Sequence, residues 1–191
     1  MILKRIKNNI NGFTLMELLV TMVITLLIFI IISTSFILTQ RVFREGNTRA
    51  ELIQNGRITT DLMAREIRQA VEIVTTLPPD NSNPAIIPHD LQFEDGHVTS
   101  QIQYLKYYLE GNLLRRQIIV YDFETNPGVY VYWNDTDPFG EPRQNILEDK
   151  IIGEYFSNID FYGLDVINLD ITLEKNDERI KIKSIIFPRN I

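Results

Sequence analysis

The sequence predicts an α+β protein in which one long N-terminal helix packs on an antiparallel β-sheet head. Three observations predict this fold: an uncharged apolar run near the N-terminus, an amphipathic stretch after it, and short segments rich in Tyr, Ile and Val in the remainder. We divide the 191 residues into a leader at 1–12, a transmembrane helix half at 13–38, an amphipathic helix half at 39–77 and a β head at 78–191.

The apolar run extends from Leu18 to Leu38, 21 residues without a charge. As a helix it is about 32 Å long, close to the hydrocarbon thickness of a bilayer. A buried helix of a soluble domain is one alternative. A secretory signal peptide is another, but its apolar region is shorter and ends at a small-residue cleavage site. The length of the run favours a membrane span. Three basic residues precede it and four follow it, so charge does not decide its orientation.

Glu17 is an acidic residue at the N-terminal edge of this apolar run. A carboxylate at membrane depth costs up to about 3 kcal/mol, and for that reason it is a candidate functional residue. The alternative is a Glu at the level of the lipid headgroups, where its cost is small. The position of Glu17 by itself leaves both interpretations open.

The residues around Glu17 carry a more specific pattern. The segment Gly-Phe-Thr-Leu-Met-Glu-Leu-Leu-Val at 12–20 follows a short basic leader and opens the apolar helix. It resembles the class III signal of type IV pilins and type II secretion pseudopilins. The resemblance implies that a prepilin peptidase cuts between Gly12 and Phe13 on the cytoplasmic side and methylates the new amine of Phe13. It also implies a single-pass protein of the cytoplasmic (inner) membrane, with its head outside, which then enters a filament.

Physical chemistry suits the roles that this resemblance assigns. Gly12 has no side chain, so a protease can approach the backbone closely. In a low-dielectric helix bundle, Glu17 of one subunit could neutralise the Phe13 amine of its neighbour, because unpaired charges there are costly. The implied partners are the prepilin peptidase, other minor and major pilins or pseudopilins, and membrane lipid.

The second half of the helix is expected to cover the head. Apolar residues recur at mostly three- to five-residue spacings from Val42 to Val74, which is typical of an amphipathic helix. Asp61 and Arg65 are four residues apart and are expected to pair. Gly46 and Gly56 are expected to allow close packing or a bend. Pro78 and Pro79 are expected to end the helix at about Thr76. A helix of that length is too long for the head alone to bury. Residues 59–70 resemble the same region of W-type minor pilins and J-type minor pseudopilins.

The head is predicted to begin with a Pro- and Asn-rich loop at 78–98 and to continue as an antiparallel sheet, with the helix face from Ile53 to Val74 packed on one side. Its predicted hairpin and its C-terminal Arg-Asn sequence resemble the corresponding parts of W-type minor pilins and J-type minor pseudopilins. The predicted strands are a hairpin of 102–109 and 113–120 that turns at Gly111, then 129–133, a strand near 159–162, and 166–173 and 180–187 joined by a turn at 174–179.

Few residues suggest chemistry. The absence of cysteine excludes disulfides, thiolate metal sites and cysteine nucleophiles. His89 and His97 lie in the predicted loop without a recognised catalytic spacing, and no nucleotide-binding or zinc-protease motif occurs. Asp135, Asp137 and Glu141 offer hard oxygen ligands for calcium, the one cofactor considered. The alternative is a solvated acidic loop, because their spacing departs from the twelve-residue EF-hand loop.

Two features of the head leave its contacts open. Residues 78–191 contain ten basic and nineteen acidic residues, a net charge of −9, which disfavours nucleic-acid binding by the head alone. Its aromatic residues fit either alternate faces of strands or an exposed patch for a partner. These residues are Tyr104, Tyr107, Tyr108, Tyr130, Tyr132 and Trp133.

Together these features predict a minor pilin or pseudopilin without enzymatic activity. Its head would cap, initiate or decorate a pilus, a type II secretion pseudopilus or a competence pseudopilus, and the sequence does not distinguish these machines. The alternative is a membrane-tethered binding or adhesion domain with an uncleaved signal anchor, in which Glu17 would be dispensable.

Overall fold

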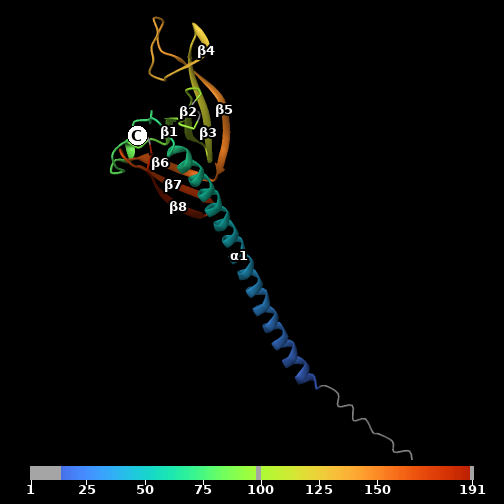
Figure 1. The fold of residues 1–191 in the computed structure, drawn as a ribbon. Helices are drawn as coiled ribbons and strands as arrows, with labels where there is room; N and C mark the ends of the chain where they lie inside the picture. Colours follow the sequence, from blue (N-terminus) through green and yellow to red (C-terminus); the bar gives the residue numbers. More distant parts are fainter. Residues whose placement is uncertain (1–13, 98–99, 190–191) are drawn as a thin grey trace, which may run out of the picture. The chain divides into compact units, whose positions relative to one another are not determined.

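The computed structural model describes residues 14–97 and 100–189. The chain forms two compact units, residues 1–46 and 47–191. Helix α1, Leu15–Ile67, contains 53 residues and contributes to both units (Figure 1). The second unit contains the C-terminal turns of α1 and all the strands. The predicted α+β arrangement, one long apolar N-terminal helix plus antiparallel sheets, is confirmed and matches a pilin-like fold.

Helix α1 ends at Ile67, so the prediction that it continues to Thr76 is wrong. Its last turn tightens, with the Gln69 N–H donating to Glu66 O at 3.0 Å. The chain then runs beside strand β1, Asp90–Glu94, where the Val71 N–H donates to Glu94 O at 3.1 Å. Hydrogen bonds to a strand thus replace helical ones, and the apolar spacing beyond Ile67 belongs to an extended segment.

The first sheet is built around β3. Its strands are β1, β2 (Tyr104–Glu110), β3 (Leu113–Phe123), β4 (Asn126–Val131) and β5 (Arg143–Glu154). Neighbouring strands in the order β1-β2-β3-β4 are antiparallel. β2 and β4 pair with successive parts of β3, residues 113–119 and 121–123, whereas β5 pairs with residues 113–122 of β3. The predicted hairpin of β2 and β3 is confirmed, with Gly111 at φ +63° in its turn.

Two strands of this sheet were not predicted. β1 lies inside the region predicted as a loop at 78–98, where Pro84–Ile86 also forms a short 3₁₀ helix, η1. β5 pairs with β3 through two register shifts, so that Leu147 and Ile152 are inserted as bulges. A bulge interrupts the alternation of inward and outward side chains, which is the signal by which a strand is predicted.

The second sheet is a three-stranded antiparallel meander, where a single sheet had been expected. Its strands are β6 (Phe156–Tyr162), β7 (Ile167–Lys175) and β8 (Glu178–Ile186). Asn176 and Asp177 have φ of +50° and +60°, as in the tight two-residue turns that suit a hairpin. The chain passes from β5 to β6 at Tyr155, whose φ is +68°.

The core of the second unit lies between α1 and the two sheets. Leu52, Met63 and Ile67 on the helix are fully buried, together with Phe93 and Phe161 from the strands. Gly56 faces Leu173 and Ile182, and an added Cβ would collide with the Ile182 side chain. Of the two roles predicted for Gly56, close packing is therefore the one observed.

Candidate functional site

The start of α1 is fixed by a reciprocal pair of side chains. The Thr14 N–H and the Thr14 hydroxyl both donate to Glu17 Oε2 at 3.0 Å, and the Glu17 N–H donates to Thr14 Oγ1 at 3.3 Å. This is a capping box, in which a Thr and a Glu three residues apart satisfy two backbone donors at a helix start. Glu17 therefore has a defined structural partner at the position where the sequence predicts a functional carboxylate.

From Leu15 to Phe43 the helix presents an apolar surface that no described part of the chain covers. Its large apolar side chains are between 44% and 84% exposed. The helix is long and apolar enough to cross a membrane. The residues concerned are Leu15, Met16, Leu18, Leu19, Val20, Met22, Val23, Ile24, Leu26, Leu27, Ile28, Phe29, Ile30, Ile31, Ile32, Phe36, Ile37, Leu38, Val42 and Phe43.

The threonines on this surface are satisfied within the helix. The hydroxyls of Thr21, Thr25, Thr34 and Thr39 donate to backbone carbonyls three or four residues earlier, at 2.7 to 3.0 Å. A hydroxyl bonded in this way needs no water and can face hydrocarbon at low cost. These polar residues are therefore compatible with the membrane span that the sequence predicts.

The C-terminal turns of α1 have one side packed on the head and one side exposed. On the exposed side, Ile53 and Ile58 are 39% and 59% exposed. They contribute to a shallow hollow of about 530 Å³ together with Ala50, Gln54, Arg57 and Asp61. The predicted ion pair between Asp61 and Arg65 does not form, although both residues are described. This side offers another chain an apolar surface with charged edges.

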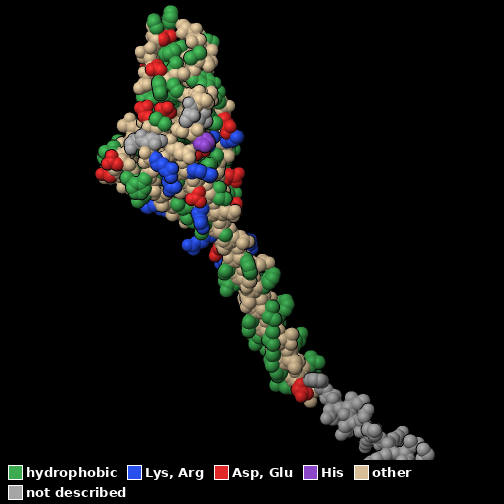
Figure 2. All heavy atoms as spheres, in the orientation of Figure 1, with side chains coloured by type: hydrophobic (Ala, Val, Ile, Leu, Met, Phe, Trp, Pro, Cys, Tyr) green, Lys and Arg blue, Asp and Glu red, His purple; other side chains and the backbone are tan. Residues whose placement is uncertain are grey.

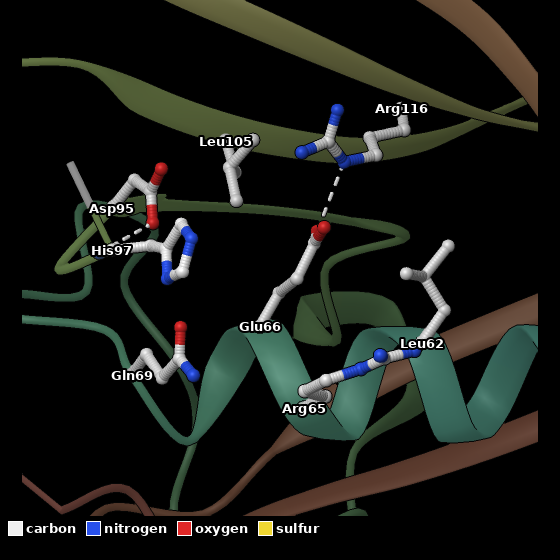
Figure 3. Close-up of a pocket in the computed structure, with 8 residues that line it drawn as sticks. All are labelled: Leu62, Arg65, Glu66, Gln69, Asp95, His97, Leu105 and Arg116. Carbon is white, nitrogen blue, oxygen red and sulfur yellow. Dashed lines mark hydrogen bonds and ion pairs between the residues drawn. The ribbon is translucent and has the colours of Figure 1, made fainter.

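A charged network lies on the packed side of α1 (Figure 3). Glu66 accepts a hydrogen bond from the hydroxyl of Tyr107 and one from Arg116 Nε at 2.9 Å. Arg116 also contacts Glu148 at 3.5 Å. Burial and the neighbouring carboxylate raise the pKa of Tyr107, so its hydroxyl stays protonated and donates. The network joins the helix to β2, β3 and β5.

The hollow beside this network does not assemble a reactive centre. It measures about 270 Å³ and is lined by residues of α1, the turn after α1, β2, β3 and the loop after β1. Asp95 is already bonded, since it accepts from Gln103 Nε2 at 2.6 Å and from the His97 N–H at 2.9 Å. Glu66 points toward Arg116, and the contact of His97 with Asp95 is made by the backbone N–H of His97 (Figure 3). These contacts favour a structural role. The lining consists of Leu62, Arg65, Glu66, Gln69, Asp95, His97, Leu105 and Arg116.

Two of the three acidic residues considered for calcium, Asp135 and Asp137, cap turns. Asp135 Oδ2 accepts from the Tyr132 N–H at 2.9 Å, and Asp137 Oδ1 accepts from the Phe139 N–H at 2.8 Å. Asp137 and Glu141 line one hollow, and Asp135 is not part of that lining. Within residues 14–97 and 100–189, no three His, Cys, Asp or Glu side chains are grouped so as to hold a metal ion. Calcium binding by these residues stays a prediction.

The aromatic residues of the head divide between the two interpretations that the sequence left open. Tyr104 and Tyr107 are fully buried, whereas Tyr132 and Trp133 are 45% and 37% exposed. The buried tyrosines are core residues, and the exposed aromatics belong to a surface.

His89 contacts a backbone carbonyl, with its Nδ1 3.0 Å from Ile159 O.

Comparison with known protein families matches the N-terminal region of the chain. Residues 7–33 match the family model described as the prokaryotic N-terminal methylation motif. The chain carries a type IV pilin-like N-terminus. This motif indicates a substrate of prepilin peptidase that assembles with other pilins, and together with the apolar helix it indicates membrane anchoring. Neither a search of curated proteins nor a search of solved structures returned a significant match.

The pilin-like motif contains every N-terminal residue that the sequence singled out. Gly12, Phe13 and Glu17 all lie within the matched residues 7–33. Gly12 and Phe13 fall outside the described residues, so cleavage between them and methylation of Phe13 stay predictions. Sequence analysis missed the role of Thr14, although a Thr three residues before a Glu at the start of an apolar run is a recognised capping signal.

Proposed function

We propose that this protein is a minor pilin or minor pseudopilin, a structural subunit of a type IV pilus-like filament. The observation that carries the proposal is the methylation motif that runs directly into an apolar helix surface, which no described residue covers. A lone subunit leaves that surface in lipid. In a filament, helices of neighbouring subunits cover it, and a head-to-tail contact that does not close produces a helical polymer.

Two surfaces would serve assembly. The apolar residues from Leu15 to Phe43 pack against the corresponding residues of other subunits, and Glu17 neutralises the methylated amine of a neighbouring Phe13. Thr14 holds the Glu17 carboxylate at the start of the helix, and the proposed pairing places it beside that amine. The exposed side of α1 around Ile53 and Ile58 is the second surface and lies on the unit that contains the head.

The head would act through contacts, without catalysis. Prepilin peptidase processes the protein in the inner membrane, with the head on the extracytoplasmic side. The head then caps, initiates or decorates the filament beside other minor subunits. The motif is typical of structural subunits, and it does not distinguish a pilus from a secretion or competence pseudopilus.

The first test is the intact mass and N-terminal sequence of the protein from cells with and without the prepilin peptidase. We expect peptidase-dependent loss of residues 1–12 and a monomethylated Phe13. A chain that begins at Met1 in both strains would overturn the proposal. It would leave a membrane-tethered domain with an uncleaved anchor.

The second test separates processing from assembly. Glu17→Val should leave cleavage largely intact and reduce incorporation into sheared filaments, measured by immunoblot of filament and membrane fractions. Glu45→Val is a matched control, because Glu45 is also an exposed glutamate of α1. Equal incorporation of the Glu17 variant and the control would contradict the role of Glu17.

A further inference from the structure

A further surface lies on the connection between β4 and β5, far from the helix in sequence. We call residues 132–142 the aromatic loop. Within it Phe139 is 83% exposed, Tyr132 45% and Trp133 37%. The loop projects from the sheet beside β4 (Figure 1). Exposed aromatic side chains clustered on one loop are typical of protein-binding surfaces, where Trp and Tyr often dominate the binding energy.

Hydrogen bonds within the aromatic loop and to neighbouring elements support its conformation. Asp137 accepts from the Phe139 N–H at 2.8 Å and, through its other oxygen, from the Thr125 hydroxyl at 3.1 Å. The backbone N–H of Trp133 donates to the buried Tyr104 hydroxyl at 3.2 Å. A loop ordered before binding loses less conformational entropy when a partner arrives.

Phe139 borders a hollow of about 230 Å³ between the aromatic loop and the β3–β4 turn. Two phenyl rings, Phe123 and Phe139, line it. Its three carboxylates form no ion pair within the described residues, whereas its one cation, Arg143, is 3.2 Å from Asp122. The remaining lining residues are Glu124, Thr125, Asp137 and Glu141.

The surroundings of the hollow are predominantly acidic. Residues 123–143 contain four acidic residues and one basic residue. On the face seen in Figure 2, the end of the head that contains β4 shows hydrophobic and acidic side chains and no Lys or Arg, whereas basic side chains gather toward the helix. An acidic partner or an anionic lipid surface would be repelled by this end of the head.

We propose that the aromatic loop binds a basic segment of another protein. Apolar side chains of the partner pack on Phe139 and Trp133. A Lys or Arg of the partner enters the hollow, where its aliphatic stem lies on the phenyl rings and its cation faces Glu124, Asp137 and Glu141. This inference goes beyond the proposed function and does not depend on filament assembly.

The test uses the full chain in a neutral detergent and two labelled peptides, one alternating arginine with leucine and one alternating glutamate with leucine. Binding is followed by peptide anisotropy and by the emission of Trp133, the only tryptophan in the chain. Phe139→Ala and Glu141→Lys should each weaken binding of the arginine peptide about tenfold. Phe187→Ala and Glu154→Lys are matched controls on exposed residues outside the loop and should leave binding unchanged.

Three results would overturn the proposal. One is equal binding of the arginine and glutamate peptides. Another is arginine-peptide binding by the two loop variants at wild-type strength. The third is a saturable change of Trp133 emission with calcium that displaces the arginine peptide and disappears in Asp137→Asn, which would assign the hollow to a metal ion. Unchanged circular dichroism of each variant shows that its fold is intact.

Discussion

The network of Glu66, Tyr107 and Arg116 allows a quantitative test of what holds α1 on the sheet. Glu66→Leu leaves the Arg116 guanidinium, whose side chain is 17% exposed, and the buried Tyr107 hydroxyl without their shared acceptor. Breaking a buried ion pair from one side costs about 3–5 kcal/mol. Arg116 keeps some solvent contact and the Glu148 carboxylate at 3.5 Å, so we expect Glu66→Leu to cost about 2–3 kcal/mol.

The decisive comparison removes the three partners together. The variant Glu66→Leu, Tyr107→Phe, Arg116→Leu has no orphaned charge or hydroxyl, so its stability should lie within about 1 kcal/mol of the native protein. Urea unfolding of the full chain in detergent, followed by Trp133 emission, measures both variants. A triple variant less stable than Glu66→Leu would refute this reasoning, because the network would then contribute more than the avoidance of unpaired groups.

Three further predictions concern the same unit and use the same urea assay. Thr60→Val should stabilise the protein by about 1 kcal/mol, because the buried Thr60 hydroxyl has no hydrogen-bond partner among the described residues; a lower unfolding midpoint would contradict this. Gly163→Ala should cost at least about 2 kcal/mol, since Gly163 has φ +112° and an added Cβ would collide with Val166 O; an unchanged midpoint would contradict the geometry. The pKa of Asp122 is lowered, chiefly by the Gly128 N–H. Its contribution to stability is therefore complete above the unfolded pKa of about 3.9 and is lost as pH falls through the lower folded pKa. Asp122→Asn should weaken the loss of stability in this acidic range; the same pH profile in both proteins would show that Asp122 does not contribute.

The elements predicted from the sequence are those whose signal is local and regular. β7 and β8 pair without a register shift, and their alternation is visible in the sequence. β5 was missed because its two bulges break that alternation. The end of α1 was misplaced because hydrogen bonds between residues 71–74 and β1, distant in sequence, decide it.

The same distinction applies to the sites. The N-terminal motif is contiguous, so residues 12–20 identify it without a structure, and the Thr14–Glu17 capping box is a local signal too. The network around Glu66 is not local, because Tyr107 and Arg116 follow it by 41 and 50 residues. The hollow at Phe139 likewise depends on the contact between Thr125 and Asp137, which no spacing in the sequence indicates.

The irregular edges of the two sheets have a consequence for contacts between neighbouring heads. β5 and β8 are edge strands, and an unprotected edge tends to recruit a strand from another molecule. β5 is irregular at Leu147 and Ile152, and β8 exposes Lys181 and Lys183. The bulges of β5 and the exposed lysines of β8 both disfavour pairing of these edges with strands of another molecule. If the protein is the filament subunit proposed above, heads crowded into one patch of bilayer can therefore remain separate, and assembly depends on the exposed apolar surface of the helix from Leu15 to Phe43.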